Sequence, residues 1–240
     1  MNESKFSPSM IIGIALIISS LVFGIFYYSS QSINNKNILS VVGSVKKQVT
    51  SDKAKLIISI NRIATTDELS QGYKDISHDF NLAKELLKKF GIDNDNLISS
   101  PISMNQMYDQ NSNNQVRYQL AQTITIQSDD VNKITEISKK IPELAAQGAI
   151  ISVQSLEYYY SKLPDLRVSL LTQAVQDAKA RAEKIAQGTG QSVGSVQSAS
   201  SGVVQVLQSN SVDISDYGNY DTSSIEKDIM VTVKVSFRLN

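Results

Sequence analysis

The chain has 240 residues and equal numbers of basic and acidic side chains, 23 Lys plus Arg against 23 Asp plus Glu, so no large field of one sign exists to attract nucleic acid. Cysteine is absent and His78 is the single histidine, which excludes disulfides, thiolate metal sites, a cysteine nucleophile and a multi-histidine metal site within one chain. We therefore predict no nucleic-acid partner, no cofactor and no metal site.

The first strong feature is an apolar run, MIIGIALIISSLVFGIFYY, which holds 19 residues without a charge. At a rise of about 1.5 Å per residue it approaches the roughly 30 Å of bilayer hydrocarbon. We predict a transmembrane helix or signal anchor over residues 10–28, after a cytoplasmic N-terminus (1–9) and before a polar tether (29–37). The residues expected to contact the membrane include Met10, Ile11, Ile12, Leu16, Leu21, Phe23, Phe26, Tyr27 and Tyr28.

Two other interpretations of this run stay open, a cleaved signal peptide and a buried core helix. The apolar region of a signal peptide usually holds about 7 to 15 residues, fewer than this run. However, Ser30 and Ser32 flank Gln31 in the small-x-small pattern of a cleavage site. Lys5 before the run and Lys36 after it give only a faint positive-inside bias, so the charges do not determine the orientation.

The first half of the remaining chain predicts two strands, a helix and a hairpin. Residues 38–50 and 54–64 alternate apolar and polar positions and are separated by a turn at 51–53; Gly43 suggests a bulge in the first strand. A helix is expected over 67–90, with Thr66 as its cap and Gly91 as its stop. Residues 96–108 and 115–127 predict a hairpin around a polar turn. The apolar stripe of the helix consists of Leu69, Tyr73, Ile76, Phe80, Ala83, Leu87 and Phe90.

The second half of the chain predicts a helix, a strand, a long helix and two further strands. A helix starts at Asp129 or Asp130 and runs to about residue 146, a strand covers 149–160, and a long helix runs from 163 to 188. Two strands follow at 191–208 and 225–239, separated by a polar segment, 209–224, that we predict to be a mobile loop. The stripe of the long helix consists of Leu166, Leu170, Ala174, Ala178, Ala182 and Ile185.

The element order is β-βαββ-α-βαββ, which predicts an α+β fold with antiparallel sheets and long helices and indicates a duplicated βαββ unit. The duplication is supported by element order alone. Two short sheets, each covered by its long helix, would bury both stripes. Sharing a sheet between subunits would protect its edges, so we expect a homo-oligomer.

A family resemblance rests on the stretch from Leu170 to Ser200, LLTQAVQDAKARAEKIAQGTGQSVGSVQSAS. Its alanine-rich helix, glycine turn and valine-containing strand resemble the SIMPL-domain family. Further matches are Val42-Gly43 in the first strand, Gly148-Ala149 before the middle strand and the closing VTVKVSFRL, so that the similarity covers residues 38–240. Ser51 stands where many members have proline, and the acidic final loop also differs.

The resemblance implies an extracytoplasmic address and an oligomer. The family is similar to bacterial periplasmic immunogenic proteins and oxidative-stress-defence proteins, some of which form ring-like or channel-like assemblies. No catalytic residues are established for it, so the resemblance implies none here.

Candidate sites are few. His78 lies off the helix stripe and is expected in solvent, and Arg181 would pair with Asp177 one turn earlier. Tyr158, Tyr159 and Tyr160 would stack on a ligand or line a subunit contact, with at most two on one face. The acidic residues of the final loop lack calcium-loop spacing and are expected to be solvated; they are Asp213, Asp216 and Asp221.

We therefore expect a non-catalytic, membrane-anchored extracytoplasmic protein that acts by oligomeric assembly and binding in envelope or oxidative stress defence. The alternative is a ligand-binding or sensory domain with a site between subunits, in which the long loop and the tyrosines form the pocket. An enzyme is the weakest hypothesis. The sequence leaves a protein partner unidentified.

Overall fold

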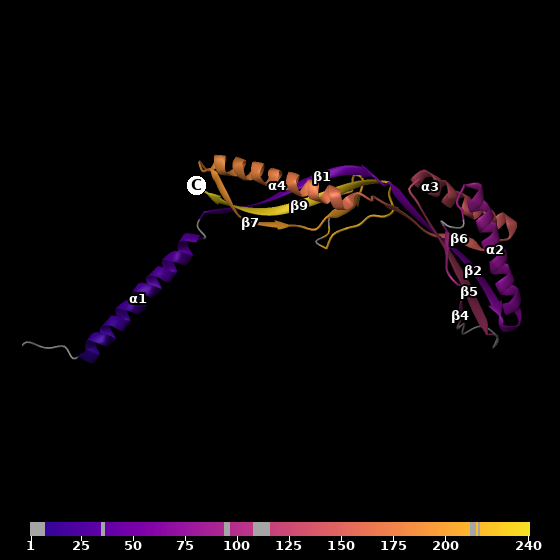
Figure 1. Cartoon of the computed structure of the whole chain (residues 1–240), viewed down its shortest axis with the longest axis horizontal. Helices are drawn as coiled ribbons and strands as arrows, with labels where there is room; N and C mark the ends of the chain where they lie inside the picture. Colours follow the sequence, from indigo (N-terminus) through magenta and orange to yellow (C-terminus); the bar gives the residue numbers. More distant parts are fainter. Residues whose placement is uncertain (1–7, 35–36, 94–96, 108–115, 212–214, 216) are drawn as a thin grey trace, which may run out of the picture. The chain divides into compact units, whose positions relative to one another are not determined.

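The computed structural model describes residues 8–34, 37–93, 97–107, 116–211, 215 and 217–240. The chain falls into two compact units, a terminal unit (1–45, 171–202 and 232–240) and a central unit (46–170 and 203–231). The helices and strands are α1 (Pro8–Asn34), β1 (Ile38–Thr50), β2 (Lys53–Thr65), α2 (Leu69–Lys89), β3 (Leu97–Ser99), β4 (Ser103–Met107), β5 (Arg117–Ser128), α3 (Val131–Lys140), β6 (Ile151–Tyr159), α4 (Leu163–Gly188), β7 (Val193–Ser201), β8 (Gln205–Gln208) and β9 (Glu226–Leu239) (Figure 1).

The helix expected at the N-terminus forms as α1, and it continues to Asn34, into the segment predicted to be a tether. The prediction that it is a transmembrane helix or signal anchor is wrong: among the described residues, no helix is long and apolar enough to cross a membrane.

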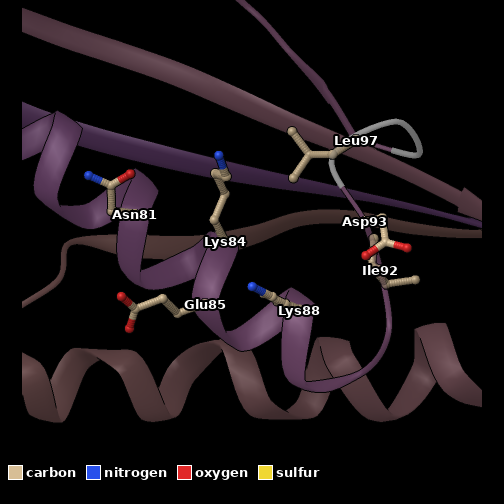
Figure 2. A pocket seen from close by; sticks show the side chains of 7 residues that line it. All are labelled: Asn81, Lys84, Glu85, Lys88, Ile92, Asp93 and Leu97. Atoms are coloured by element: carbon tan, nitrogen blue, oxygen red, sulfur yellow. The ribbon is translucent and has the colours of Figure 1, made fainter.

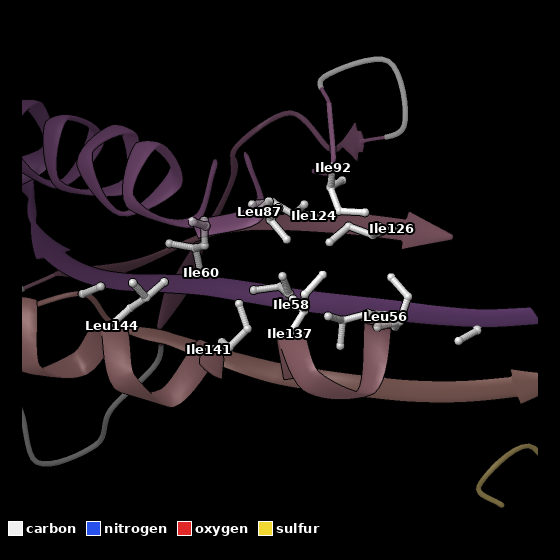
Figure 3. Close-up of a cluster of buried hydrophobic side chains, with 14 of the residues drawn as sticks. Leu56, Ile58, Ile60, Leu87, Ile92, Ile124, Ile126, Ile137, Ile141 and Leu144 are labelled. Atoms are coloured by element: carbon white, nitrogen blue, oxygen red, sulfur yellow. The ribbon is translucent and has the colours of Figure 1, made fainter. Parts of the chain in front are cut away.

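The central unit is built on a five-stranded antiparallel sheet with the order β3-β5-β2-β6, in which β4 also pairs with β5. The central pair is in register from Ala54 opposite Ser128 to Thr65 opposite Arg117. Because side chains alternate along a strand, every second residue of β2 enters the core. Figure 3 shows these side chains facing others from α2, α3 and the 3-10 turn at Ile141–Gln147; the core includes Leu56, Ile58, Ile60, Leu87, Ile124, Ile126, Ile137 and Ile141.

The face that α2 turns to this sheet differs from the predicted stripe. Tyr73 is exposed, whereas the carboxylate of Asp79 is fully buried and accepts two hydrogen bonds from Arg62, at 2.7 and 2.8 Å. The first turn begins at Thr66, and the side chain of Glu68 accepts a hydrogen bond from the backbone N–H of Thr65, so the cap is one residue earlier than predicted. A buried, bidentate pair of this kind replaces the hydration that both charges lose.

The predicted hairpin is confirmed. β4 and β5 pair from Ser103 opposite Ala121 to Met107 opposite Arg117, and the predicted turn between them lies outside the described residues. The first strand of the hairpin is interrupted at Ser100 and Pro101, because proline lacks the N–H that a strand ladder requires.

The second sheet has four strands, with the order β1-β9-β7 and with β8 paired to β9. In the terminal unit, the alanine stripe of α4 packs against Val233, Val235 and Phe237 of β9. Ile185, predicted in the stripe, is exposed, and Ala186 is buried in its place. The α+β class with antiparallel sheets is therefore confirmed.

Gly43 of β1 is the position where α4 approaches the sheet most closely. A Cβ at residue 43 would lie 2.1 Å from the carbonyl oxygen of Ala174 and 2.7 Å from the Cβ of Ala178. Beside this contact, the backbone N–H of Ser44 donates to the carboxylate of Asp177 at 2.8 Å. The hydrogen bond therefore holds α4 against β1, and the helix and the strand can come this close only because residue 43 is glycine.

The strands are divided between the sheets differently from a simple duplication. In a self-contained second βαββ unit, β6 would pair in the sheet of β9. Instead β6 pairs with β2, and β1 is the neighbour of β9. The two sheets still match in their strand order. In the five-stranded sheet, β5 lies between β2 on one side and β3 and β4 on the other. In the four-stranded sheet, β9 lies in the same way between β1 on one side and β7 and β8 on the other.

We predict that Gly43→Ala destabilises the protein by about 1 to 3 kcal/mol, because the added methyl group overlaps the backbone of α4. Urea unfolding followed by circular dichroism measures the change. Gly188→Ala is the matched control: its added Cβ would meet nothing within 4 Å, and we expect a change of less than about 1 kcal/mol. Equal stabilities of the two variants would contradict the close packing of α4 on β1.

Candidate functional site

A pocket of about 410 Å³ lies at one end of the five-stranded sheet, within the central unit. Its volume falls in the range of about 300 to 1,000 Å³ that is usual for small-molecule sites. Three neighbouring strands supply most of its wall, β2, β5 and β6. We call it the Tyr159 pocket; its lining residues are Lys53, Ala54, Lys55, Gln127, Ser128, Asp129 and Tyr159.

The charged groups of the pocket are arranged by strand. Lys53 and Lys55 are two residues apart on β2, so both side chains point to the same face of the sheet. Lys53 contacts Asp129, which follows β5, at 2.5 Å, and Lys55 contacts Glu157 of β6 at 3.4 Å. The central strand therefore contributes two ammonium groups, and each side contributes one carboxylate.

Tyr159 and Glu157 of β6 are joined by a hydrogen bond at this site. The phenolic O–H of Tyr159 donates a hydrogen bond to the Glu157 carboxylate, which, with burial and the negative charge nearby, raises the pKa of Tyr159 from 10.0 to about 12. The same hydrogen bond, together with Lys55, lowers the pKa of Glu157 against the effect of its burial. The phenol is therefore neutral and the carboxylate charged across the physiological range.

The tyrosines predicted at the end of this strand point to different faces. Tyr158 is buried in the core, where its hydroxyl lies 2.9 Å from Oγ1 of Thr135. Tyr159 lies on the opposite face, in the pocket. Its ring packs against that of Tyr220 with a centroid distance of 6.4 Å and an interplanar angle of 40°.

Tyr220 belongs to the segment 217–224, which lies between β8 and β6. The backbone of Val206 in β8 bonds to the backbone of Asn219 at 2.7 Å and to that of Asp221 at 2.8 Å. On the other side, the N–H of Tyr158 in β6 donates to the carbonyl of Thr222 at 2.7 Å. These bonds place the Tyr220 ring beside the pocket. The mobility predicted for 209–224 stays a prediction.

Asp221 is only 14% exposed, so the expectation of a solvated loop residue is wrong for it. The Nζ of Lys227, a fully buried side chain of β9, donates to the main-chain oxygen of Asp221 at 2.7 Å and lies 3.2 Å from its carboxylate. Burial opposes ionisation of Asp221, but hydrogen bonds from Ser223, Ser224 and Lys227 lower its pKa, whereas burial lowers the pKa of Lys227. Asp213 and Asp216 lie outside the described residues.

The other residues singled out by the sequence lie apart from the pocket. His78 is exposed on α2, as predicted. Arg181 pairs with Asp177 at 2.8 Å, as expected, although Asp177 also accepts the backbone hydrogen bond of β1. Ser30 and Ser32 are within α1, and their role as a cleavage site stays a prediction. Among the described residues, no three acidic or histidine side chains gather to hold a metal ion.

A second hollow of about 570 Å³ borders α2; in Figure 2 its lining residues Lys84, Glu85 and Lys88 project from α2, and Asp93 lies on the segment that follows the helix. Lys84 lies over the ring of Phe80, with its Nζ 5.8 Å from the centroid. Residues 94–96, which lie between two of its lining residues in the sequence, are outside the described part of the chain. The Tyr159 pocket is the better-defined site.

The comparison with protein families decides the relationship. Residues 39–237 match the model of the SIMPL family, described as a protein of unknown function (DUF541). The chain belongs to the SIMPL family. The match includes the whole Tyr159 pocket and the contact between Gly43 and α4, so both are parts of the SIMPL domain of this chain.

Other comparisons add little to this SIMPL assignment. No curated protein matches the chain. A crystal structure of a candidate amidohydrolase/peptidase from Burkholderia cenocepacia matches 54% of this chain at 12% identity, with a TM-score of 0.26. The match covers 32% of that protein. A score this low carries no argument about fold or activity.

Most residues of the pocket were not singled out from the sequence. The missed lining residues include Lys53, Lys55 and Asp129, and the contacts of Tyr159 with Glu157 and Tyr220 were missed as well. Alternation places Lys53 and Lys55 on one face of β2, and it places Glu157 and Tyr159 on one face of β6. It gives no indication that β6 pairs with β2, and without that pairing the two sets of residues cannot be brought together.

We predict that one of the ten tyrosines of the SIMPL chain ionises near pH 12 and that Glu157→Gln lowers this pKa toward 10, because the carboxylate stabilises the neutral phenol. The raised pKa means that this contact stabilises the fold at neutral pH and that its contribution is lost as pH rises from about 10 to about 12. Near-ultraviolet absorbance of the phenolate measures the titration. Glu136→Gln, at an exposed site on α3, is the control and should leave the profile unchanged.

Proposed function

We propose that this SIMPL protein acts without catalysis, outside the cytoplasm, by assembling with copies of itself and binding a partner in envelope or oxidative stress defence. The observation that supports assembly best is the edge of the four-stranded sheet. β1 is 13 residues long and stands at one end of the strand order, with β9 as its only neighbouring strand among the described strands. A long edge strand presents N–H and C=O groups on which another chain can pair.

The two edges of this sheet differ, which bears on the kind of assembly. β7, at the other end, is mostly exposed and consists mainly of small side chains. Val42 on β1 and Val196 on β7 are exposed apolar residues on the two edge strands. Contacts between two different edges are heterologous, and such contacts close into a ring when the rotation between neighbours permits.

We expect the full chain to be oligomeric and Val42→Lys to reduce its molecular mass toward that of a monomer, because a charge on an edge strand opposes strand pairing. Size-exclusion chromatography with light scattering measures the mass. Val168→Lys is the control, since Val168 is exposed on α4 and not on a strand. A wild-type chain that is strictly monomeric would rule out assembly, and equal effects of both substitutions would rule out the β1 edge.

The location and the stress role rest on the resemblance to exported stress-defence proteins. We expect a strain that lacks the chain to be more sensitive to peroxide or envelope stress. In this strain we then express the full chain fused after Asn240 to a reporter that is active only outside the cytoplasm. Resistance should return, and the reporter should be active in the same cells. A deletion strain with normal resistance would count against the stress role, and a complementing but inactive reporter would count against the location.

A second candidate function is ligand binding, which the Tyr159 pocket favours. The expected site lay between subunits and combined the tyrosines with the long loop. In the central unit, Tyr159 and Tyr220 meet within one chain beside a pocket of suitable volume. Ligand binding at this place does not require assembly, so the two candidate functions are separable by experiment.

A further inference from the structure

The charges of the Tyr159 pocket restrict what it can bind. Lys53 and Lys55 supply two positive groups, and Asp129 and Glu157 supply two negative groups, so the site has no net charge. A ligand with a single charge would therefore be attracted by the two groups of opposite sign and repelled by the two groups of the same sign. A ligand with one positive and one negative group can satisfy both at once.

Both kinds of charged group keep unused hydrogen-bonding capacity. The ammonium of Lys55 carries three donors, its contact with Glu157 is long at 3.4 Å, and its side chain is 29% exposed. The carboxylate of Asp129 is 81% exposed, so most of its surface is open to a ligand beside its contact with Lys53. In contrast, Glu157 is already bound by the Tyr159 hydroxyl. Asp129 is thus the acceptor available for a ligand ammonium.

The aromatic side of the pocket sets the third requirement. The hydroxyl of Tyr159 is occupied by Glu157, which fixes the orientation of its ring and leaves the ring as the contacting surface. Tyr220 packs against Tyr159 at a tilt, and its segment is held by the backbone bonds to Val206. A fixed aromatic ring favours stacking with another aromatic group.

These three requirements converge on one class of ligand. We propose that the Tyr159 pocket binds a free aromatic α-amino acid, with its carboxylate between Lys53 and Lys55, its ammonium at Asp129 and its ring against Tyr159. The inference rests on the second candidate function, ligand binding at this pocket, and names the chemical class of the ligand.

The chain lacks tryptophan, so the fluorescence of added L-tryptophan can be followed against a tyrosine-only background. The test titrates the full chain into L-tryptophan and into three analogues: indole-3-propionate, which lacks the ammonium, tryptamine, which lacks the carboxylate, and N-acetyl-L-tryptophan amide, which lacks both charges. We expect L-tryptophan to bind about tenfold or more tightly than each analogue, because each missing group removes a charge-assisted hydrogen bond.

Substitutions then locate the binding. Asp129→Asn and Lys55→Met should each weaken L-tryptophan binding about tenfold. Asp129→Asn is at an exposed position and leaves the cap of α3 intact, since the carboxylate of Asp130 accepts the N–H of Lys133. The matched controls are Glu136→Gln and Lys139→Met, which remove the members of an exposed ion pair on α3 and should not change the affinity.

The outcomes separate the inference from the function on which it rests. An analogue that binds as tightly as L-tryptophan, with binding still lost in Asp129→Asn or Lys55→Met, would overturn the amino-acid assignment and retain a ligand site. Binding of L-tryptophan that none of the pocket variants changes would overturn the proposal, because the site would then lie elsewhere. No binding of any probe would overturn the amino-acid assignment and remove the support for ligand binding.

Discussion

The terminal unit depends on the contact between one glycine and one helix. Gly43 lets the backbone of α4 approach β1 so closely that a Cβ would overlap the carbonyl oxygen of Ala174. The alanines of α4 are needed for the same close approach, because larger side chains would move the helix away from the sheet. Dispersion contacts weaken steeply with distance, so close approach compensates for the small area that alanine buries. The bond from Ser44 to Asp177 then fixes the position of the helix along the strand.

The pairing of β6 with β2 has the largest consequence for the site. It places Glu157 opposite Lys55 and Tyr159 opposite Lys53, next to the end of β5. The opposite face of the same strands is apolar and covered by α2 and α3. Polar and charged side chains can therefore gather on the other face of the sheet without removing apolar side chains from the core. The contact between the fully buried Lys227 and Asp221 helps to hold the segment that carries Tyr220.

The proposed assembly and the proposed ligand binding would use different parts of the chain. The edge of β1 offers backbone groups, whose pairing is largely independent of side-chain identity. The Tyr159 pocket offers side chains of defined charge, which discriminate between small molecules. Local sequence could predict neither feature fully, because the exposed edge and the pocket both depend on which strands are neighbours.

The sequence by itself determined the element order, the α+β class and the close bounds of β1 and α4, because alternation, helical stripes and glycine stops are local signals. It also carried the SIMPL relationship through Gly43 and the alanines of α4. The sequence did not predict contacts between separate elements of the chain. These are the burial of Asp79 with Arg62, the exchange of β1 and β6 between the sheets, and the pairing of Asp221 with Lys227. Hydropathy also predicted a membrane-spanning helix that the described residues of α1 do not provide. Only the tertiary structure decided the strand neighbours, since antiparallel pairing joins segments of similar pattern and the pattern alone does not select the partner.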